Sequence, residues 1–100
     1  MLFRSKDTVT GLLARFTDKA MAQLVELTQA LAAKDATRFK EVSHSLKGAA
    51  WNLSARRLGD AALLGENAGR ENDMAAAAKA LAEIRAAFAD FSAAVEPYKK

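Results

Sequence analysis

The chain contains no cysteine, only one proline and no long hydrophobic run. The absence of cysteine excludes disulfides and thiolate chemistry and is typical of a reducing compartment. No stretch approaches about 18 consecutive apolar residues, and no signal-peptide arrangement opens the chain. We therefore expect a cytoplasmic protein without membrane contact. The single proline, Pro97, lies almost at the end, and runs of β-branched residues are absent, which favours an all-α structure.

The glycines and the basic residues are too dispersed along the chain to form a phosphate-binding loop or a nucleic-acid surface. The five glycines do not form the cluster of a phosphate-cradling loop, so we expect no ATP site and no kinase activity of the chain's own. The 15 basic and 12 acidic residues form no basic stripe with stacking aromatics, which argues against a nucleic-acid partner. The net charge of +3 suits an acidic protein surface or a phosphoryl group instead.

Apolar residues recur at spacings of three and four along most of the chain, which predicts helices. Alanine supplies much of the 51% hydrophobic content, so we expect a thin core with closely packed helices. The expected helices cover about residues 7–14, 17–33, 35–53, 54–69 and 73–95.

Polar residues at the start of these segments are the expected N-caps: Asp35, Ser54 and either Asn72 or Asp73. The stripe of the last segment alone would also suit a coiled-coil dimer. The earlier segments carry stripes too, however, and short connections make neighbouring helices antiparallel. The sequence therefore predicts one monomeric domain over residues 1–100, an up-and-down antiparallel four-helix bundle with a short additional N-terminal helix.

The only histidine, His44, lies in the sequence HSLKGAAWNL at residues 44–53. The apolar stripe of this helix runs from Phe39 to Leu53. A helix turns about 100° per residue, so the His44 side chain points roughly 160° away from Val42 and Leu46. We therefore expect the imidazole to be exposed near the middle of its helix.

Three neighbours share the outward face with His44. Lys47 and Gly48 follow it at three and four residues, and Lys40 lies one turn before it. Glycine inside a helix costs about 0.5–1 kcal/mol relative to alanine, so a glycine in an alanine-rich chain indicates that a side chain would be in the way. Two cations and an open approach favour a phosphoryl group on the ring nitrogen.

Other interpretations of His44 are a surface histidine without a role, a metal ligand or a catalytic base. Glu41 and His44 have the Glu-x-x-His spacing of di-metal bundles, but such sites need two of these motifs facing the bundle interior. Ser43 and Ser45 point to other faces of the helix, so hydrolysis lacks a nucleophile and oxyanion donors. We expect no metal ligands and no cofactor of the chain's own.

The sequence resembles the histidine-containing phosphotransfer (HPt) domain of multistep bacterial phosphorelays over roughly residues 12–70. The resemblance rests on the H-x-L-K-G core together with its upstream apolar pattern and a few later positions: LLARF at 12–16, Leu24, Leu27, Leu31, Asp35, HSLKGAAWNL at 44–53, Leu58, Glu66 and Arg70. The family implies a four-helix bundle that accepts a phosphoryl group from a receiver-domain aspartate and passes it to another receiver. Its partners would be response-regulator receivers and a hybrid sensor histidine kinase, and magnesium would be bound by the receiver.

The resemblance also implies roles for individual residues. His44 would be phosphorylated, Lys47 would steady the phosphoryl oxygens, and Gly48 would leave the approach open. Glu66 would hydrogen-bond the other ring nitrogen and so fix the tautomer. Arg70 would add positive charge. The domain would then be a phosphoryl carrier and not an enzyme, either free-standing or part of a larger membrane-anchored sensor kinase. The alternative is a non-catalytic helical interaction module.

Three positions depart from the family pattern. Ser54 stands where glycine is common and should act as an N-cap. Gly65 replaces the usual leucine and should loosen its helix. Trp51 replaces something smaller, and it should either bind the partner, at a patch edged by Lys40, or tuck against the next helix near Gly65.

Overall fold

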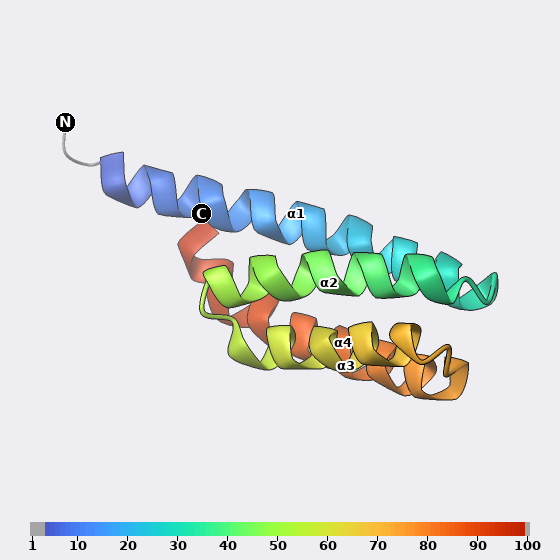
Figure 1. The fold of residues 1–100 in the computed structure, drawn as a ribbon. Coiled ribbons are helices and arrows are strands. Elements are labelled where there is room, and N and C mark those ends of the chain that lie inside the picture. The colour runs from blue at the N-terminus through green and yellow to red at the C-terminus, as the bar shows by residue number, and fades with distance from the viewer. Residues whose placement is uncertain (1–3, 100) are drawn as a thin grey trace.

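The computed structural model describes residues 4–99, and these are helical apart from short turns (Figure 1). No strand occurs within this part of the chain, so the expected all-α class is confirmed. The elements are α1 (Arg4–Ala32), α2 (Ala36–Asn52), α3 (Arg56–Arg70), α4 (Met74–Val95) and the short 3₁₀ helix η1 (Glu96–Lys99).

The prediction of a separate short helix at the N-terminus is wrong, because α1 is continuous from Arg4 to Ala32. Thr17, where a second helix was expected to begin, lies inside α1. Its hydroxyl donates to the Leu13 carbonyl at 2.8 Å and so is satisfied without ending the helix. Phe16 is buried and meets the Phe91 ring of α4 edge-on, with 5.3 Å between ring centroids. No proline interrupts this stretch, so nothing forces a break.

Each turn between helices contains one residue in the left-handed conformation: Lys34, Ser54 and Asn72, with φ between 55° and 61°. Behind each of them, a backbone N–H reaches back five residues to a carbonyl of the preceding helix, as from Asp35 to Ala30 at 2.8 Å. This is the hydrogen bond of a Schellman-type helix end. Asp35 and Asp73 then cap α2 and α4 by accepting from backbone N–H groups, as expected.

Ser54 does not cap α3, so that prediction is wrong. The N-cap is Ala55, which offers no side-chain oxygen. Ser54 occupies the left-handed position just before it, with φ 61°, in the turn between α2 and α3. Glycine is the residue that adopts this conformation most easily, so a glycine at this position would form the turn with less strain than serine does.

The closest-packed pair of helices is α2 and α3. Three glycines face α2 from α3, and a Cβ on any of them would overlap α2 atoms: at Gly59 the Trp51 ring, at Gly65 the Ser43 hydroxyl at 2.6 Å, and at Gly69 the Ala36 carbonyl at 2.8 Å. The missing side chain at Gly65 therefore lets the two helices approach closely, and the loosening of α3 expected from this glycine stays a prediction.

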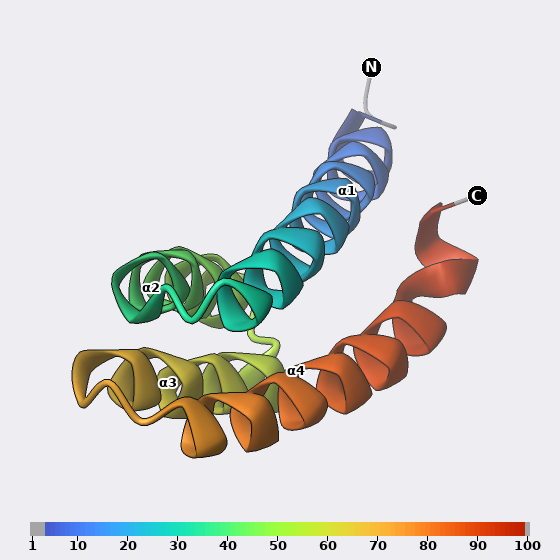
Figure 2. The same cartoon turned by 90° about the vertical axis from the view of Figure 1, so that its right-hand side faces the viewer.

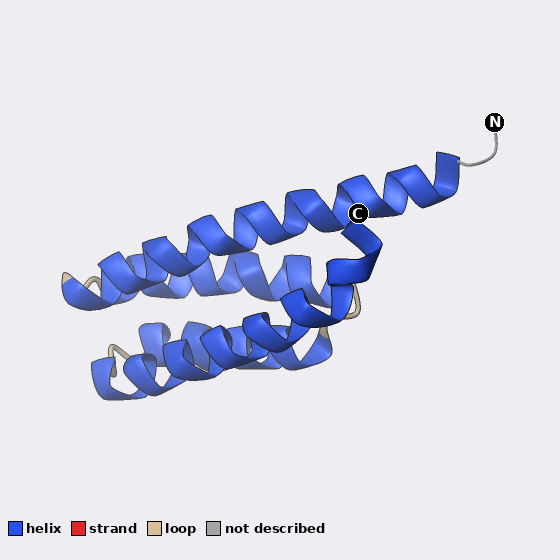
Figure 3. Ribbon diagram, turned by 180° about the vertical axis from the view of Figure 1, so that it is seen from behind, coloured by secondary structure: helices blue, strands red, loops and turns tan. Residues whose placement is uncertain are grey.

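The core is thin, as the alanine content predicts. Its largest fully buried side chains come from all four helices: Leu27, Phe39, Leu46, Leu58 and Ile84. Alanines fill much of the remaining interior. The protein is elongated, with principal dimensions of 50 × 19 × 19 Å. Figures 2 and 3 show α1 extending beyond α2 and α3 at its N-terminal end, with η1 lying beside it.

Candidate functional site

His44 lies near the middle of α2 and points away from the core. The buried residues of α2 are Phe39, Ser43, Leu46 and Ala50, which lie on the other side of the helix. The His44 side chain is 66% exposed. The orientation expected from the apolar stripe is therefore observed, and a large partner can reach the ring from solvent.

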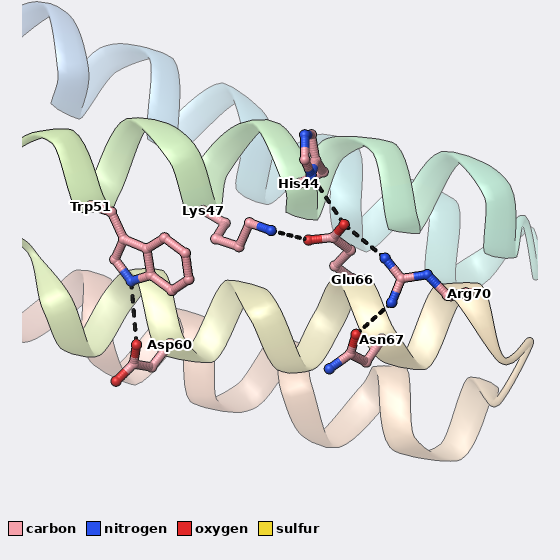
Figure 4. A network of polar contacts seen from close by, with 7 residues as sticks. All are labelled: His44, Lys47, Trp51, Asp60, Glu66, Asn67 and Arg70. Atoms are coloured by element: carbon pink, nitrogen blue, oxygen red, sulfur yellow. Dashed lines mark hydrogen bonds and ion pairs between the residues drawn. The ribbon is translucent and has the colours of Figure 1, made fainter.

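Glu66 of α3 binds the Nδ1 edge of this imidazole (Figure 4). His44 Nδ1 lies 3.0 Å from Glu66 Oε2, and the carboxylate side chain is only 8% exposed. A carboxylate can only accept, so Nδ1 carries the proton and donates it to this bond. In the neutral ring the other nitrogen, Nε2, then has a free lone pair. The arrangement fixes the tautomer and leaves Nε2 as the ring nitrogen that can act as a nucleophile.

The same carboxylate also binds two cations. Lys47 Nζ lies 2.7 Å from Glu66 Oε1, and an Arg70 guanidinium nitrogen lies 2.9 Å from Oε2. Arg70 donates in addition to Asn67 Oδ1 at 2.6 Å. Figure 4 shows the three donors converging on Glu66 from α2 and from the end of α3. Glu66 is thus the centre of the site, and Lys47 points to it, on the Nδ1 side of the ring.

These contacts lower the pKa of Glu66. The largest cause is the hydrogen bond from Lys47, burial opposes it, and the hydrogen bond from His44 adds to it. The folded state therefore holds the Glu66 proton less tightly than the unfolded chain, and the ionised carboxylate stabilises the fold. This contribution is present above the ordinary value of 4.5 and is lost as the pH falls from there through the lowered pKa.

We expect Glu66→Gln to lower the free energy of unfolding at pH 7, because the mostly buried Lys47 ammonium loses its negatively charged partner. As the pH falls from 4.5 through the lowered pKa of Glu66, the difference from the wild type should shrink, because the wild-type carboxyl takes up a proton and also becomes neutral. Urea unfolding of both proteins between pH 3 and pH 7 measures it. Glu41→Gln, at an exposed position of α2, is the control and should show no such dependence. A difference that stays constant with pH would contradict the assignment.

Gly48 and Lys40 lie on either side of His44 along α2. Apart from the backbone of the same helix and the two neighbouring residues, no atom lies within 4 Å of the place where a Gly48 Cβ would be, so the backbone here is open to an approaching group. Lys40 is half-buried, because its stem packs beside Gly69 of α3. Both positions therefore flank the imidazole, as the helical spacing predicts.

Trp51 is both exposed and packed against α3. Its side chain lies on Gly59, and the indole Nε1 donates to Asp60 Oδ1 at 3.2 Å, yet 43% of the residue remains exposed. The ammonium of Lys47 lies 5.5 Å from the ring centroid. The Trp51 ring contacts Gly59, whereas the sequence predicted a contact near Gly65. Gly59, Asp60 and Asn67 were not predicted from the sequence. For Gly59 a signal exists, because the spacing of the glycines on α3 indicates a close contact between helices.

Within residues 4–99 we find no group of three or more histidine, cysteine, aspartate or glutamate side chains that could hold a metal ion. None of the helices described for this chain combines the length and the apolar character needed to cross a membrane.

A family model described as the Hpt domain matches residues 11–94. The match therefore covers most of the chain and extends beyond the resemblance at residues 12–70 into α4. Neither the curated proteins nor the solved structures contain a match to this chain.

Proposed function

The chain belongs to the Hpt domain family, whose members act as phosphocarriers in two-component phosphorelays, and we propose that it carries the phosphoryl group on Nε2 of His44. One observation supports this most: the exposed ring has its Nδ1 bound to a buried carboxylate, so the solvent-facing nitrogen is the one with the free lone pair. We also assign the chain to the up-and-down antiparallel bundle, because consecutive helices pack together across turns of three residues.

The reaction requires little from the domain beyond position and charge. The Nε2 lone pair attacks the phosphorus of a receiver's aspartyl phosphate, and the bond between phosphorus and the aspartate oxygen breaks. The aspartate leaves as a carboxylate with the electron pair. The Nδ1 proton stays in its hydrogen bond with Glu66, which offsets the positive charge on the ring. The reverse sequence passes the group to another receiver, and the magnesium belongs to the receiver's acidic pocket.

Hpt domains are carriers and not kinases, so the phosphoryl group comes from a partner. We propose response-regulator receivers and a hybrid sensor histidine kinase as these partners, with the domain acting as a monomer in the cytoplasm. Gly48 leaves room for the receiver to approach, since no side chain from elsewhere in the fold lies within 4 Å of its Cβ position. Arg70, which is 56% exposed, and Lys40 add positive charge at the edges of the docking surface.

Incubation with a phosphorylated receiver tests the function. We expect acid-labile, base-stable label to move from the receiver to this chain within minutes and to return when an unphosphorylated receiver is added. A chain that binds receivers but never takes label would be the non-catalytic interaction module, and the proposal would be abandoned.

Charged and apolar residues of the docking surface should affect different rate constants of receiver binding. Lys40→Glu should slow association with a receiver, most visibly at low salt, because exposed charges steer encounter.

Trp51→Ala should speed dissociation and cost about 1–3 kcal/mol of binding free energy, because tryptophan is a frequent interface anchor. Stopped-flow binding measures both rates. Lys79→Glu is the charge-matched control, on an exposed position of α4, and should change neither. If Trp51→Ala lowers the melting temperature and leaves dissociation unchanged, the tryptophan is structural.

A further inference from the structure

The ammonium of Lys47 does not lie where a phosphoryl group on His44 would need it. It is bound to Glu66 Oε1 at 2.7 Å, on the Nδ1 side of the imidazole, while the phosphoryl group would sit on Nε2, at the opposite side of the ring. The Lys47 side chain is only 17% exposed, and its ammonium lies 5.5 Å from the centroid of the Trp51 ring. In the unmodified protein Lys47 is thus paired with Glu66 and lies near the Trp51 indole.

Phosphorylation changes the balance of charge around this lysine. A phosphoryl group brings nearly two negative charges and three strong acceptor oxygens. Lys47 is three residues after His44 on the same helix face, within the reach of a lysine side chain. Glu66 would still accept from His44 Nδ1 and Arg70 after losing Lys47. The carboxylate thus keeps two donors on Oε2 when the lysine leaves, while the buried Oε1 loses its contact with Lys47.

We propose that Lys47 is a positioning residue that changes partner, leaving Glu66 and the Trp51 indole for the phosphoryl group when His44 is phosphorylated. The proposal rests on His44 as the phosphorylated residue. Trp51 itself stays in place, since Gly59 and Asp60 hold it independently of Lys47. The docking surface then exists in two states: the Lys47 ammonium lies beside the indole in the unphosphorylated carrier and on the phosphoryl group in the phosphorylated carrier. A receiver that contacts both Trp51 and Lys47 would therefore bind the two forms differently.

The only tryptophan of the chain makes this exchange observable. A nearby ammonium group quenches indole fluorescence by donating a proton to the excited ring, so departure of Lys47 should raise the emission. Phosphoramidate supplies the phosphoryl group without a protein partner. The His44 Nε2 lone pair attacks its phosphorus, the phosphorus–nitrogen bond breaks, and ammonia leaves with the electron pair.

The experiment treats the full chain with phosphoramidate and follows phosphohistidine by ³¹P NMR beside tryptophan emission. We expect emission to rise in proportion to the phosphorylated fraction. Lys47→Met should start at the higher emission and show no further rise at equal phosphorylation, while Lys79→Met, at an exposed position of α4, should respond like the wild type. In the wild type, the ε-methylene NMR signal of Lys47 should shift on phosphorylation, which tests the exchange without any substitution.

The outcomes separate the two proposals. Absence of a phosphohistidine signal in the wild type would overturn the proposed function and this inference with it. Full phosphorylation with unchanged emission and an unmoved Lys47 signal would overturn the exchange alone. An equal rise in Lys47→Met and in the wild type would also overturn it, since the emission would then report the phosphoryl group directly.

Discussion

His44→Gln will take no acid-labile label from a phosphorylated receiver, and it will fold like the wild type. The label is lost because glutamine has no nucleophilic ring nitrogen, and the chain contains no second histidine. The fold is kept because the side chain is 66% exposed and its one polar contact, to Glu66, can be remade by a glutamine amide. We expect the free energy of unfolding to stay within about 0.5 kcal/mol of the wild type.

Label transfer and thermal melting of this variant are measured beside Glu41→Gln. Glu41 is exposed on the same helix and is the carboxylate of the Glu-x-x-His spacing, so Glu41→Gln should transfer normally if no metal is involved. Acid-labile label remaining on the His44→Gln protein would show that another residue accepts the phosphoryl group.

Two glycines should respond to the same substitution with opposite signs. Gly69→Ala should destabilise the fold by about 1–3 kcal/mol, because the added Cβ meets backbone atoms of α2 that cannot move aside. Three atoms lie 2.8 Å from its position: the Ala36 carbonyl oxygen and the Lys40 N and Cβ. Gly48→Ala should stabilise by up to about 1 kcal/mol, because its Cβ enters open space and helix propensity improves.

Thermal melting resolves this pair, since about 1 kcal/mol moves the melting temperature of a domain this size by roughly 4–8 °C. A normal melting temperature for Gly69→Ala would mean that α2 and α3 separate without cost, contrary to the packing described. Gly48→Ala is the matched control for helix propensity alone. Gly48→Gln, with a folded but blocked face, should then fail in transfer.

The helical class, the family and most helix ends were predictable from sequence. Strong apolar periodicity located α2, α3 and α4, and Asp35 and Asp73 are capping residues in both the sequence and the structure. The outward direction of His44 follows from the same periodicity, because direction within one helix depends only on residue spacing.

What could not be predicted depends on how two helices sit against each other. The contact of Trp51 with Gly59 and Asp60, and the convergence of Lys47 and Arg70 on one carboxylate, need the relative register of α2 and α3. No local pattern encodes that register. The continuity of α1 could not be predicted for a different reason: a threonine at position 17 suits a cap and a helix interior alike. In the continuous helix its hydroxyl donates to the Leu13 carbonyl.

The unequal contacts between helices have a consequence for how the molecule opens. The contacts of His44 and Lys47 with Glu66 join α2 to α3, the pair that packs most closely, while α1 and α4 pack less closely against each other. Amide hydrogen exchange should therefore be graded, with the first half of α1 and the end of α4 exchanging through local opening, and α2 and α3 only with global unfolding. The histidine, its carboxylate and the two cations then keep their geometry through fluctuations that loosen the chain's two ends.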